Sequence, residues 1–226
     1  MKKVQKKIQK DYDLIARDYA NKRSRPGEKM QMAVPYLKKG MRILDLGCGP
    51  GKFLELMPNG VECIGLDFSQ KLLSIAGKNY PDAEFVYGDM TNEKVWQKLG
   101  KFDAVFAFAC FHHLITKRDQ QKTTKFIYEH LKDNGALMIV VWNLWQERYK
   151  KYRKKNKKQL IIPWHLSDGK KIVKSINRKC YVFEPEELKK LIEEQGFKVD
   201  KEFFTHGKNL SDAKEFGVIA KKAADC

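Results

Sequence analysis

Apolar residues occur along this chain in short runs, and the stretches between the runs have helical spacing. The five runs have the length of strands and are rich in Val, Ile, Leu and Phe; they lie at 42–46, 62–66, 84–87, 102–108 and 136–142. None alternates strictly between apolar and polar residues, which is typical of strands buried on both faces of a parallel sheet. The intervening spacing predicts helices at 52–57, 70–79, 94–99 and 120–132.

The two ends of the chain add further elements to this alternating pattern. A helix is predicted over 9–21, and a second one begins at Pro185 and ends before Gly196. Strands at 197–204 and 215–220 follow, and the short loop between them predicts an antiparallel pair. The expected fold is therefore α/β: a Rossmann-like, doubly wound, seven-stranded and mostly parallel sheet with an antiparallel last strand.

Length and composition limit the class of protein. The 226 residues are enough for one well-buried core, so we expect a single domain over 1–226. No apolar run approaches the roughly 20 residues of a membrane span, and the basic N-terminus lacks the apolar stretch of a secretory signal. We therefore expect no membrane association and a cytoplasmic location. Five widely spaced cysteines without a C-x-x-C pattern predict reduced thiols and no metal site.

The net charge of +17 is concentrated in two segments. Residues 1–40, a basic arm, carry +8, and residues 144–180, a basic insertion, carry +11, whereas 41–143 are neutral overall. Charge placed in this way favours a polyanionic partner such as nucleic acid, although a merely solvated lysine-rich surface is the alternative. The insertion follows the fifth strand, and we expect it at the carboxyl ends of the strands, where open α/β sheets bind ligands.

Candidate chemistry gathers at the ends of the first three strands. The run from Asp45 to Gly51 reads D-L-G-C-G-P-G and lies between a strand and a helix. Glycines at such a position allow a tight turn and a close approach of the backbone to a ligand. Asp67 ends the second strand, at the spacing where a carboxylate meets a ribose diol, and Asp89 follows the third. The sequence predicts an adenosine-sized crevice.

Two other interpretations of this motif are weaker. One is a glycine-rich turn with solvent-exposed acids, but all three acids stand at the carboxyl ends of strands. The other is a dinucleotide site, but the glycines read G-x-G-x-G instead of G-x-G-x-x-G, and Asp45 would place negative charge near a pyrophosphate. A sulfonium cofactor that carries an ammonium group tolerates that charge.

With these motifs the chain resembles the class I S-adenosylmethionine-dependent methyltransferases. The resemblance implies the class I methyltransferase fold and S-adenosylmethionine as cofactor. Its cofactor-binding positions would be Tyr12 and Tyr19 over the methionine moiety, Asp45, Gly47, Gly49 and Gly51 beside it, Asp67 at the ribose, Phe68, Asp89 and Met90 at the adenine, and the backbone near Ala107 and Ala109.

Motifs outside the cofactor region resemble a narrower family, the tRNA wobble-uridine methyltransferases that esterify 5-carboxymethyluridine. The matching segments, in chain order, are 15–19, 22–26, 109–113, 141–146, Ile162-Pro163-Trp164 and 178–188. The chain departs from the family at Gly27, where the family has Trp, and at 179–181, where it has Tyr-Tyr-His. The resemblance implies methyl transfer to a carboxylate of tRNA, and related eukaryotic enzymes act with a small zinc-binding partner.

A carboxylate acceptor is ionised at neutral pH, so the reaction needs positioning and desolvation and no strong base. We expect Arg23 and His112 as cationic catalytic residues that anchor this acid. Expected substrate-binding residues are Arg25, Trp142, Trp164, His165 and Arg178, because aromatic and basic side chains suit an exposed anticodon base. The competing hypotheses are a small-molecule O- or N-methyltransferase, with the insertion as a lid, and a non-catalytic RNA-binding protein on a methyltransferase scaffold.

Overall fold

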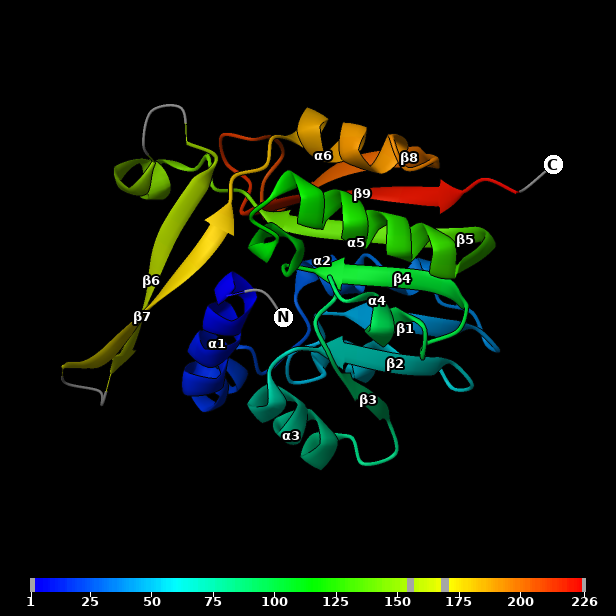
Figure 1. The fold of residues 1–226 in the computed structure, drawn as a ribbon, viewed down its shortest axis with the longest axis horizontal. Coiled ribbons are helices and arrows are strands. Elements are labelled where there is room, and N and C mark those ends of the chain that lie inside the picture. Colours follow the sequence, from blue (N-terminus) through cyan, green and yellow to red (C-terminus); the bar gives the residue numbers. More distant parts are fainter. Residues whose placement is uncertain (1–2, 154–156, 168–170, 225–226) are drawn as a thin grey trace.

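The computed structural model describes residues 3–153, 157–167 and 171–224. Its central sheet has the strand order β3-β2-β1-β4-β5-β9-β8 (Figure 1). The strands are β1 (Arg42–Leu46), β2 (Glu62–Asp67), β3 (Glu84–Tyr87), β4 (Phe102–Phe108), β5 (Leu131–Trp142), β8 (Phe197–Thr205) and β9 (Glu215–Lys222). The first five pair in parallel, and β9 is antiparallel to both β5 and β8. The predicted fold class is confirmed.

Helices precede β1 and connect most of the strands along the chain. The α-helices are α1 (Lys3–Lys22), α2 (Glu28–Gln31), α3 (Gln70–Asn79), α4 (Glu93–Trp96), α5 (Lys117–His130) and α6 (Pro185–Glu193). The 3-10 turns are η1 (Val34–Tyr36), η2 (Lys52–Leu56), η3 (Phe111–His113) and η4 (Glu147–Tyr152). Side chains of Ser69, Asn92 and Thr116 accept backbone N–H groups at the starts of α3, α4 and α5.

Two predicted helices are shorter than the sequence pattern indicates. The segment 52–57 forms only the 3-10 turn η2, since Met57 is extended, as the residue before Pro58 must be. The segment 94–99 is helical only to Trp96, and Gly100, with a φ of +71°, follows before β4. The first segment connects the neighbouring strands β1 and β2, and the second connects β3 at the sheet edge to β4, so the order of elements is unchanged.

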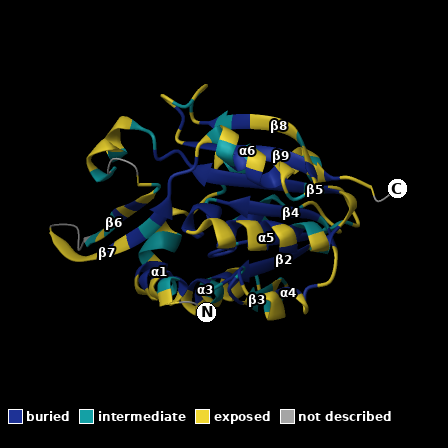
Figure 2. Ribbon diagram, turned by 45° about the horizontal axis from the view of Figure 1, so that its top comes forward, coloured by how far each residue is buried: buried dark blue, intermediate teal, exposed yellow. Residues whose placement is uncertain are grey.

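Apolar side chains pack on both faces of the sheet, and exposed residues lie on its outer helices (Figure 2). One face packs Trp96, Phe111 and Phe183 among the helices α4, α5 and α6. The other face packs Phe53 against Phe106. Strands β1 and β4 are buried along nearly their whole length, which explains the continuous apolar runs in the sequence.

The basic insertion contains a second, two-stranded sheet that the sequence analysis did not predict. Strands β6 (Gln159–Ser167) and β7 (Ile172–Tyr181) form an antiparallel hairpin that lies beside α1 (Figure 1). In β7 the side chains of Ile176, Arg178 and Cys180 alternate inward. An arginine at an inward position hides the period-2 pattern, because a charged residue indicates a solvent face. Residues 154–156 and 168–170 of the insertion lie outside the described residues.

Two expectations from composition concern membrane-spanning segments and the state of the cysteines. Within the described ranges, no helix is both long and apolar enough to cross a bilayer. Cys48, Cys63, Cys110 and Cys180 are buried free thiols, as predicted. Cys226 lies outside the described residues.

Candidate active site

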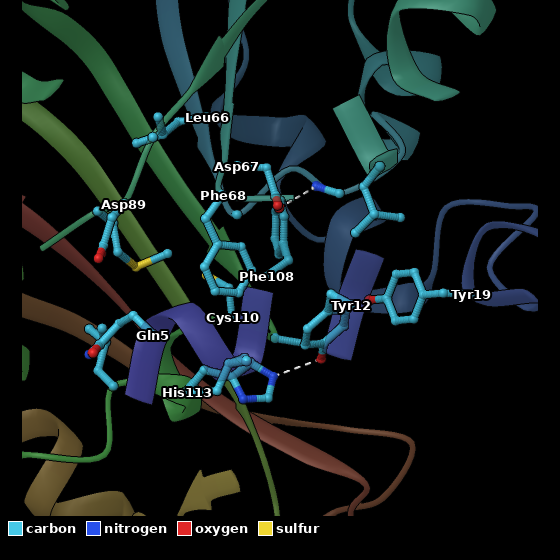
Figure 3. A pocket seen from close by; sticks show the side chains of 18 residues that line it. Gln5, Tyr12, Tyr19, Leu66, Asp67, Phe68, Asp89, Phe108, Cys110 and His113 are labelled. Atoms are coloured by element: carbon cyan, nitrogen blue, oxygen red, sulfur yellow. Dashed lines mark hydrogen bonds between the residues drawn. The ribbon is translucent and has the colours of Figure 1, made fainter. Parts of the chain in front are cut away.

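A pocket lies at the carboxyl ends of β1, β2, β3 and β4, with α1 across it (Figure 3). The glycine loop after β1 contributes Gly47 and Gly49. The other strands contribute Leu66, Asp67 and Phe68, then Gly88, Asp89 and Met90, and then Phe108, Ala109 and Cys110. The side facing α1 is lined by Gln5, Ile8, Tyr12 and Tyr19. The crevice predicted from the strand ends is present, and it has a helical cover.

The glycine loop is shaped by a contact that only glycine permits. Gly47 has a φ of +76°, and a Cβ placed there would lie 2.4 Å from Cβ of Cys110. The Sγ of Cys110 in turn donates to the carbonyl oxygen of Leu46, at 2.9 Å. The loop backbone therefore lies directly against the segment that follows β4, and Gly47 lines the pocket without a side chain of its own.

We predict that Gly47→Ala lowers the free energy of unfolding by about 2–4 kcal/mol, because both the positive φ and the contact with Cys110 oppose a Cβ. The matched control is Gly27→Ala, where nothing lies within 4 Å of the added Cβ. Urea unfolding measures both variants. Equal free energies of unfolding for the two variants would contradict this account of the loop.

Three buried carboxylates surround the pocket. Asp67 accepts the backbone N–H of Gly49 through Oδ2 at 2.9 Å and that of Ser69 through Oδ1 at 2.8 Å. Asp89 accepts from Thr91 through Oδ1, and its Oδ2 has no partner. Asp45 is buried in β1 behind the loop, and its Oδ2 also lacks a partner. An unpartnered buried carboxylate oxygen costs free energy, so Oδ2 of Asp89, which lines the pocket, is suited to accept a hydrogen bond from a ligand.

Burial raises the pKa of two of these acids. Loss of solvation raises the pKa of Asp67 to about 6, against the opposing effect of its backbone hydrogen bonds. Loss of solvation, together with the nearby Asp67, raises the pKa of Asp45 to about 8. For acids with raised pKa values the folded state binds more protons than the unfolded state, so their contribution to stability falls as pH rises from about 4 to 8.

The affinity for a cationic ligand should depend on pH in the opposite direction to stability. Such a ligand binds more tightly when the carboxylates are ionised, so its affinity rises with pH. We predict that the affinity for a sulfonium cofactor decreases about tenfold between pH 7.5 and pH 5, as Asp67 takes up a proton. Isothermal titration at both pH values measures the change. An affinity independent of pH would show that Asp67 does not act as a carboxylate toward the ligand.

Helix α1 is fastened over the pocket by hydrogen bonds to separate parts of the chain. Ser69 donates to Asp13 at 2.6 Å, and the indole of Trp164 donates to Asp18 at 2.7 Å. The hydroxyl of Tyr12 lies 2.7 Å from Nε2 of His113. The rings of Tyr12 and Tyr19 meet edge to face, with centroids 5.5 Å apart. The structure thus places both tyrosines at the pocket, where the family resemblance expects them.

Beyond Tyr12 lies a buried arginine without an acidic partner. Arg178 is 6% exposed, and its Cζ lies 4.7 Å from the ring centroids of both Trp142 and Trp164. Its Nε and Nη1 have no hydrogen-bond partner, and no salt bridge to it occurs within the described ranges. A stacked guanidinium with two nitrogens that lack hydrogen-bond partners is able to bind an anion. We call Arg178, Trp142 and Trp164 the arginine cage.

His112 adjoins this cage but does not carry the positive charge that we expected of it. Its ring lies 4.3 Å from that of Trp142, and its Nε2 has no partner. Burial, and then the charges of neighbouring basic groups, hold the pKa of His112 well below its usual value. The side chain is therefore neutral at pH 7. It offers a hydrogen bond at the cage, whereas the charge comes from Arg178.

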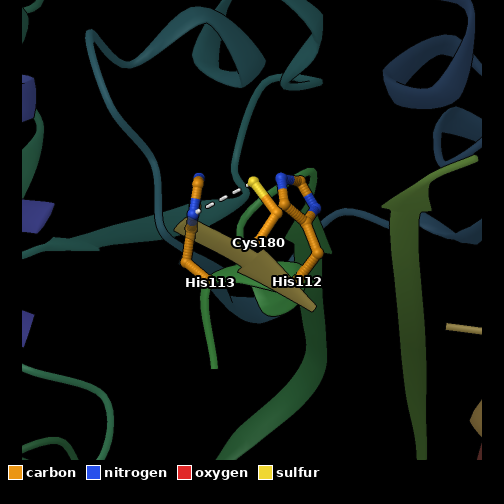
Figure 4. Close-up of side chains that lie close together, drawn as sticks. All are labelled: His112, His113 and Cys180. Atoms are coloured by element: carbon orange, nitrogen blue, oxygen red, sulfur yellow. Dashed lines mark hydrogen bonds between the residues drawn. The ribbon is translucent and has the colours of Figure 1, made fainter. Parts of the chain in front are cut away.

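His112, His113 and Cys180 form a buried cluster whose potential ligating atoms lie within 4.8 Å of one another (Figure 4). Nδ1 of His113 lies 3.0 Å from the carbonyl oxygen of Lys179, and Nε2 faces Tyr12. The simplest consistent assignment has Nδ1–H of His113 donating to Lys179 and Tyr12 donating to Nε2. These bonds fasten β7 to η3 and set the position of the cage.

The remaining predicted site residues differ in how far their side chains are buried. Arg23 and Arg25 are exposed, and Cζ of Arg23 lies 5.7 Å from the ring centroid of Tyr19. His165 is exposed and hydrogen-bonds to Ser175. Gly51 and Ala107 are buried and do not line the pocket, although their neighbours Gly49 and Phe108 do.

Several lining residues were not predicted from the sequence, among them Gln5, Ile8, Cys110 and His113. Gln5 and Ile8 precede Tyr12 at helical spacing, so extending the predicted helix toward the N-terminus would have placed them on the same face.

Comparisons with known proteins agree with this geometry. A family model described as a methyltransferase domain matches residues 17–202. Among solved structures, an S-adenosylmethionine-dependent methyltransferase from Clostridium acetobutylicum superposes with a TM-score of 0.72 at 16% identity, covering 94% of this chain and 99% of that one. The CcbJ methyltransferase from Streptomyces caelestis gives a TM-score of 0.73 at 15% identity, with 96% and 98% covered.

The chain therefore belongs to the methyltransferase domain family, and it has the class I methyltransferase fold. The motif after β1 predicted membership of this family.

Curated relatives are more specific. A tRNA (carboxymethyluridine(34)-5-O)-methyltransferase of Arabidopsis thaliana is 32% identical over 147 residues, which are 64% of this chain and 35% of that protein. The Saccharomyces cerevisiae protein of the same name is 26% identical over 169 residues, 74% and 60% respectively. An uncharacterized protein of Methanocaldococcus jannaschii is 28% identical over 224 residues, 94% and 81%. The match thus spans about a third of the Arabidopsis protein's length.

Proposed function

We propose that this protein transfers a methyl group from S-adenosylmethionine to a carboxylate oxygen of a carboxymethylated wobble uridine in tRNA. The observation that carries the proposal is the arginine cage, a buried cation that has no acidic partner among the described residues and lies beside Tyr12 of the cofactor pocket. The names of the relatives in Arabidopsis and yeast support the same acceptor.

The pocket residues fit S-adenosylmethionine. Asp67 lies at the end of β2 with lone pairs free for ribose hydroxyls, and the unpartnered Oδ2 of Asp89 suits an amino group. The ring of Phe68 offers a face to the adenine, and Tyr12 and Tyr19 cover the other end. Asp45 lies buried behind the glycine loop, where its raised pKa of about 8 keeps it mostly protonated at pH 7 unless a cationic group nearby favours the ionised form. When bound, the cofactor supplies an electrophilic methyl group on a positively charged sulfur.

The arginine cage suits a carboxylate attached to a planar base. Nε and Nη1 of Arg178 have no partner, so either can donate a charge-assisted hydrogen bond to a carboxylate oxygen. The two tryptophan rings hold the guanidinium and screen it from water, so the acid loses its hydration as it binds. The unpartnered Nε2 of His112 provides one further hydrogen-bonding group next to Trp142.

This arrangement requires no general base. The acceptor oxygen is already anionic, and the residues at the site orient it, exclude water and leave its charge only partly neutralised. Tyr12 lines the cofactor pocket, its hydroxyl lies 2.7 Å from Nε2 of His113, and the charge of Arg178 acts on the same hydroxyl. Binding of cofactor under α1 and binding of the acid at the cage are therefore linked through Tyr12.

Three further expectations remain predictions. Arg23 is exposed at the edge of Tyr19, where it can meet the acceptor from the solvent side. A cytoplasmic location and a small zinc-binding partner are implied by the family resemblance alone.

The proposal is tested with methyl-labelled S-adenosylmethionine and total tRNA. The expected product is label in tRNA that mild base releases as methanol, since a methyl ester is base-labile and an N- or C-methyl group is not. Base-stable label, or label found only in small molecules, would exclude carboxyl methylation of tRNA.

A further inference from the structure

A second concave region lies on the side of α1 away from the cofactor pocket, between that helix and the β6–β7 hairpin. Its volume is about 820 Å3. Lys3, Lys6, Lys7, Lys10 and Lys179 line it together with Val4, Ile8, Asp11, Ile161 and Asn177. One wall comes from α1 near the N-terminus and the other from the β6–β7 hairpin. We call this region the lysine groove.

The charge of the lysine groove is strongly one-sided. Its five lysines face a single acid, Asp11, which lies 2.7 Å from Nζ of Lys7. Lys3, Lys6, Lys10 and Lys179 have no ion pair among the described residues. The groove thus carries about four uncompensated positive charges, and a concave surface focuses the resulting field.

The groove also has an apolar wall. Ile161, on β6 opposite Lys179, is 55% exposed. Unpaired lysines can bind anionic groups, and an exposed aliphatic side chain can contact flat, weakly polar rings. Together they suit a polymer that has anionic groups along one side and such rings along the other. A single strand of RNA has this character.

Its position relates the groove to methyl transfer. Ile8 lines both the groove and the cofactor pocket, so the two are separated by the thickness of α1. In β7, Lys179 lies in the groove and the preceding Arg178 is buried in the cage, because successive side chains of a strand point to opposite faces. An RNA strand bound in the groove therefore passes close to Arg178, the residue proposed to anchor the acceptor carboxylate.

We propose that the lysine groove binds the sugar-phosphate backbone of the RNA strand that flanks the target nucleotide. This inference rests on the proposed function, and it deepens that function by placing the RNA between α1 and the hairpin. The phosphates lie along Lys3, Lys6, Lys10 and Lys179, and a ribose or base contacts Ile161.

The test compares two quadruple variants. The groove variant replaces Lys3, Lys6, Lys10 and Lys179 with Gln and keeps Lys7 paired with Asp11. The control variant replaces four exposed lysines outside the groove, Lys78, Lys94, Lys98 and Lys198, with Gln. Fluorescence anisotropy with a labelled anticodon stem-loop measures affinity over a series of salt concentrations, and calorimetry measures the affinity of each variant for S-adenosylmethionine.

We expect the groove variant to bind the stem-loop at least 30-fold more weakly than the control variant at low salt. The slope of log K against log salt concentration should become shallower by about 2 to 3, because each single-strand phosphate contact contributes roughly 0.7. Cofactor affinity should stay within threefold in both. Equal RNA affinity and equal slopes would overturn the groove assignment and leave the proposed function standing. Absence of salt-dependent RNA binding by the wild type would overturn both.

Discussion

Replacing Arg178 with Met should reduce methylation of the carboxylate acceptor roughly 100- to 1,000-fold in kcat/KM, without loss of folding stability. The anchor of an anion is worth about 2–5 kcal/mol when its partner would otherwise stay buried and unpaired. The guanidinium has two nitrogens without partners, so an apolar side chain of similar length removes a desolvated charge. The lost stacking on Trp142 and Trp164 opposes this gain.

This combination distinguishes an anchor from a structural residue. A residue kept for stability would lower the melting temperature on replacement, whereas we expect the melting temperature of Arg178→Met to be unchanged or raised. The affinity of Arg178→Met for S-adenosylmethionine should remain within threefold of the wild-type affinity. Arg153→Met is the control, because Arg153 also stacks on a tryptophan, at 5.3 Å from the ring of Trp145, but donates to the Trp145 carbonyl oxygen. Full turnover by Arg178→Met would remove the cage from the mechanism.

The second large effect is expected at Asp67. Asp67→Asn preserves the shape of the side chain but removes its charge, and an amide nitrogen facing Gly49 cannot accept the N–H that Oδ2 now accepts. We expect the dissociation constant for S-adenosylmethionine to rise about 100-fold, from the lost charge-assisted bonds and the unsatisfied N–H of the loop.

Calorimetric titration measures this change, with Asp82→Asn as the control, because Asp82 is an exposed acid in the turn before β3. The residual binding of Asp67→Asn should also lose most of its dependence on pH between 5 and 7.5, because Asp67 is the group that titrates there. A variant that binds the cofactor as tightly as the wild type would contradict the assignment of Asp67 to the ribose.

The central sheet could be predicted because burial on both faces leaves a continuous apolar run, and the runs at β1 and β4 are of this kind. The acids Asp67 and Asp89 could be predicted for a related reason. Parallel strands place their carboxyl ends at one edge, so a polar residue after each strand reaches a common pocket. This logic required only local patterns and their spacing.

The cage could be predicted only in part. Arg178, Trp142 and Trp164 were each predicted as substrate-binding residues. Their stacking depends on the β6–β7 hairpin, whose alternating pattern is obscured in the sequence because Arg178 occupies an inward position. The neutrality of His112 follows from complete burial, which no local pattern reveals. Cys180 meets His113 across 67 residues, at 3.9 Å, in a segment that departs from the family pattern.

The central claim is that the acceptor is a carboxylate on the wobble uridine. Two synthetic anticodon stem-loops test it most directly, one with 5-carboxymethyluridine at the wobble position and one with uridine there. Each is incubated with the protein and S-adenosylmethionine, and the nucleosides are analysed by mass spectrometry. We predict a methyl ester on the first stem-loop and no methylation of the second. Equal methylation of both, or methylation of neither while a small acid is methylated, would contradict the account.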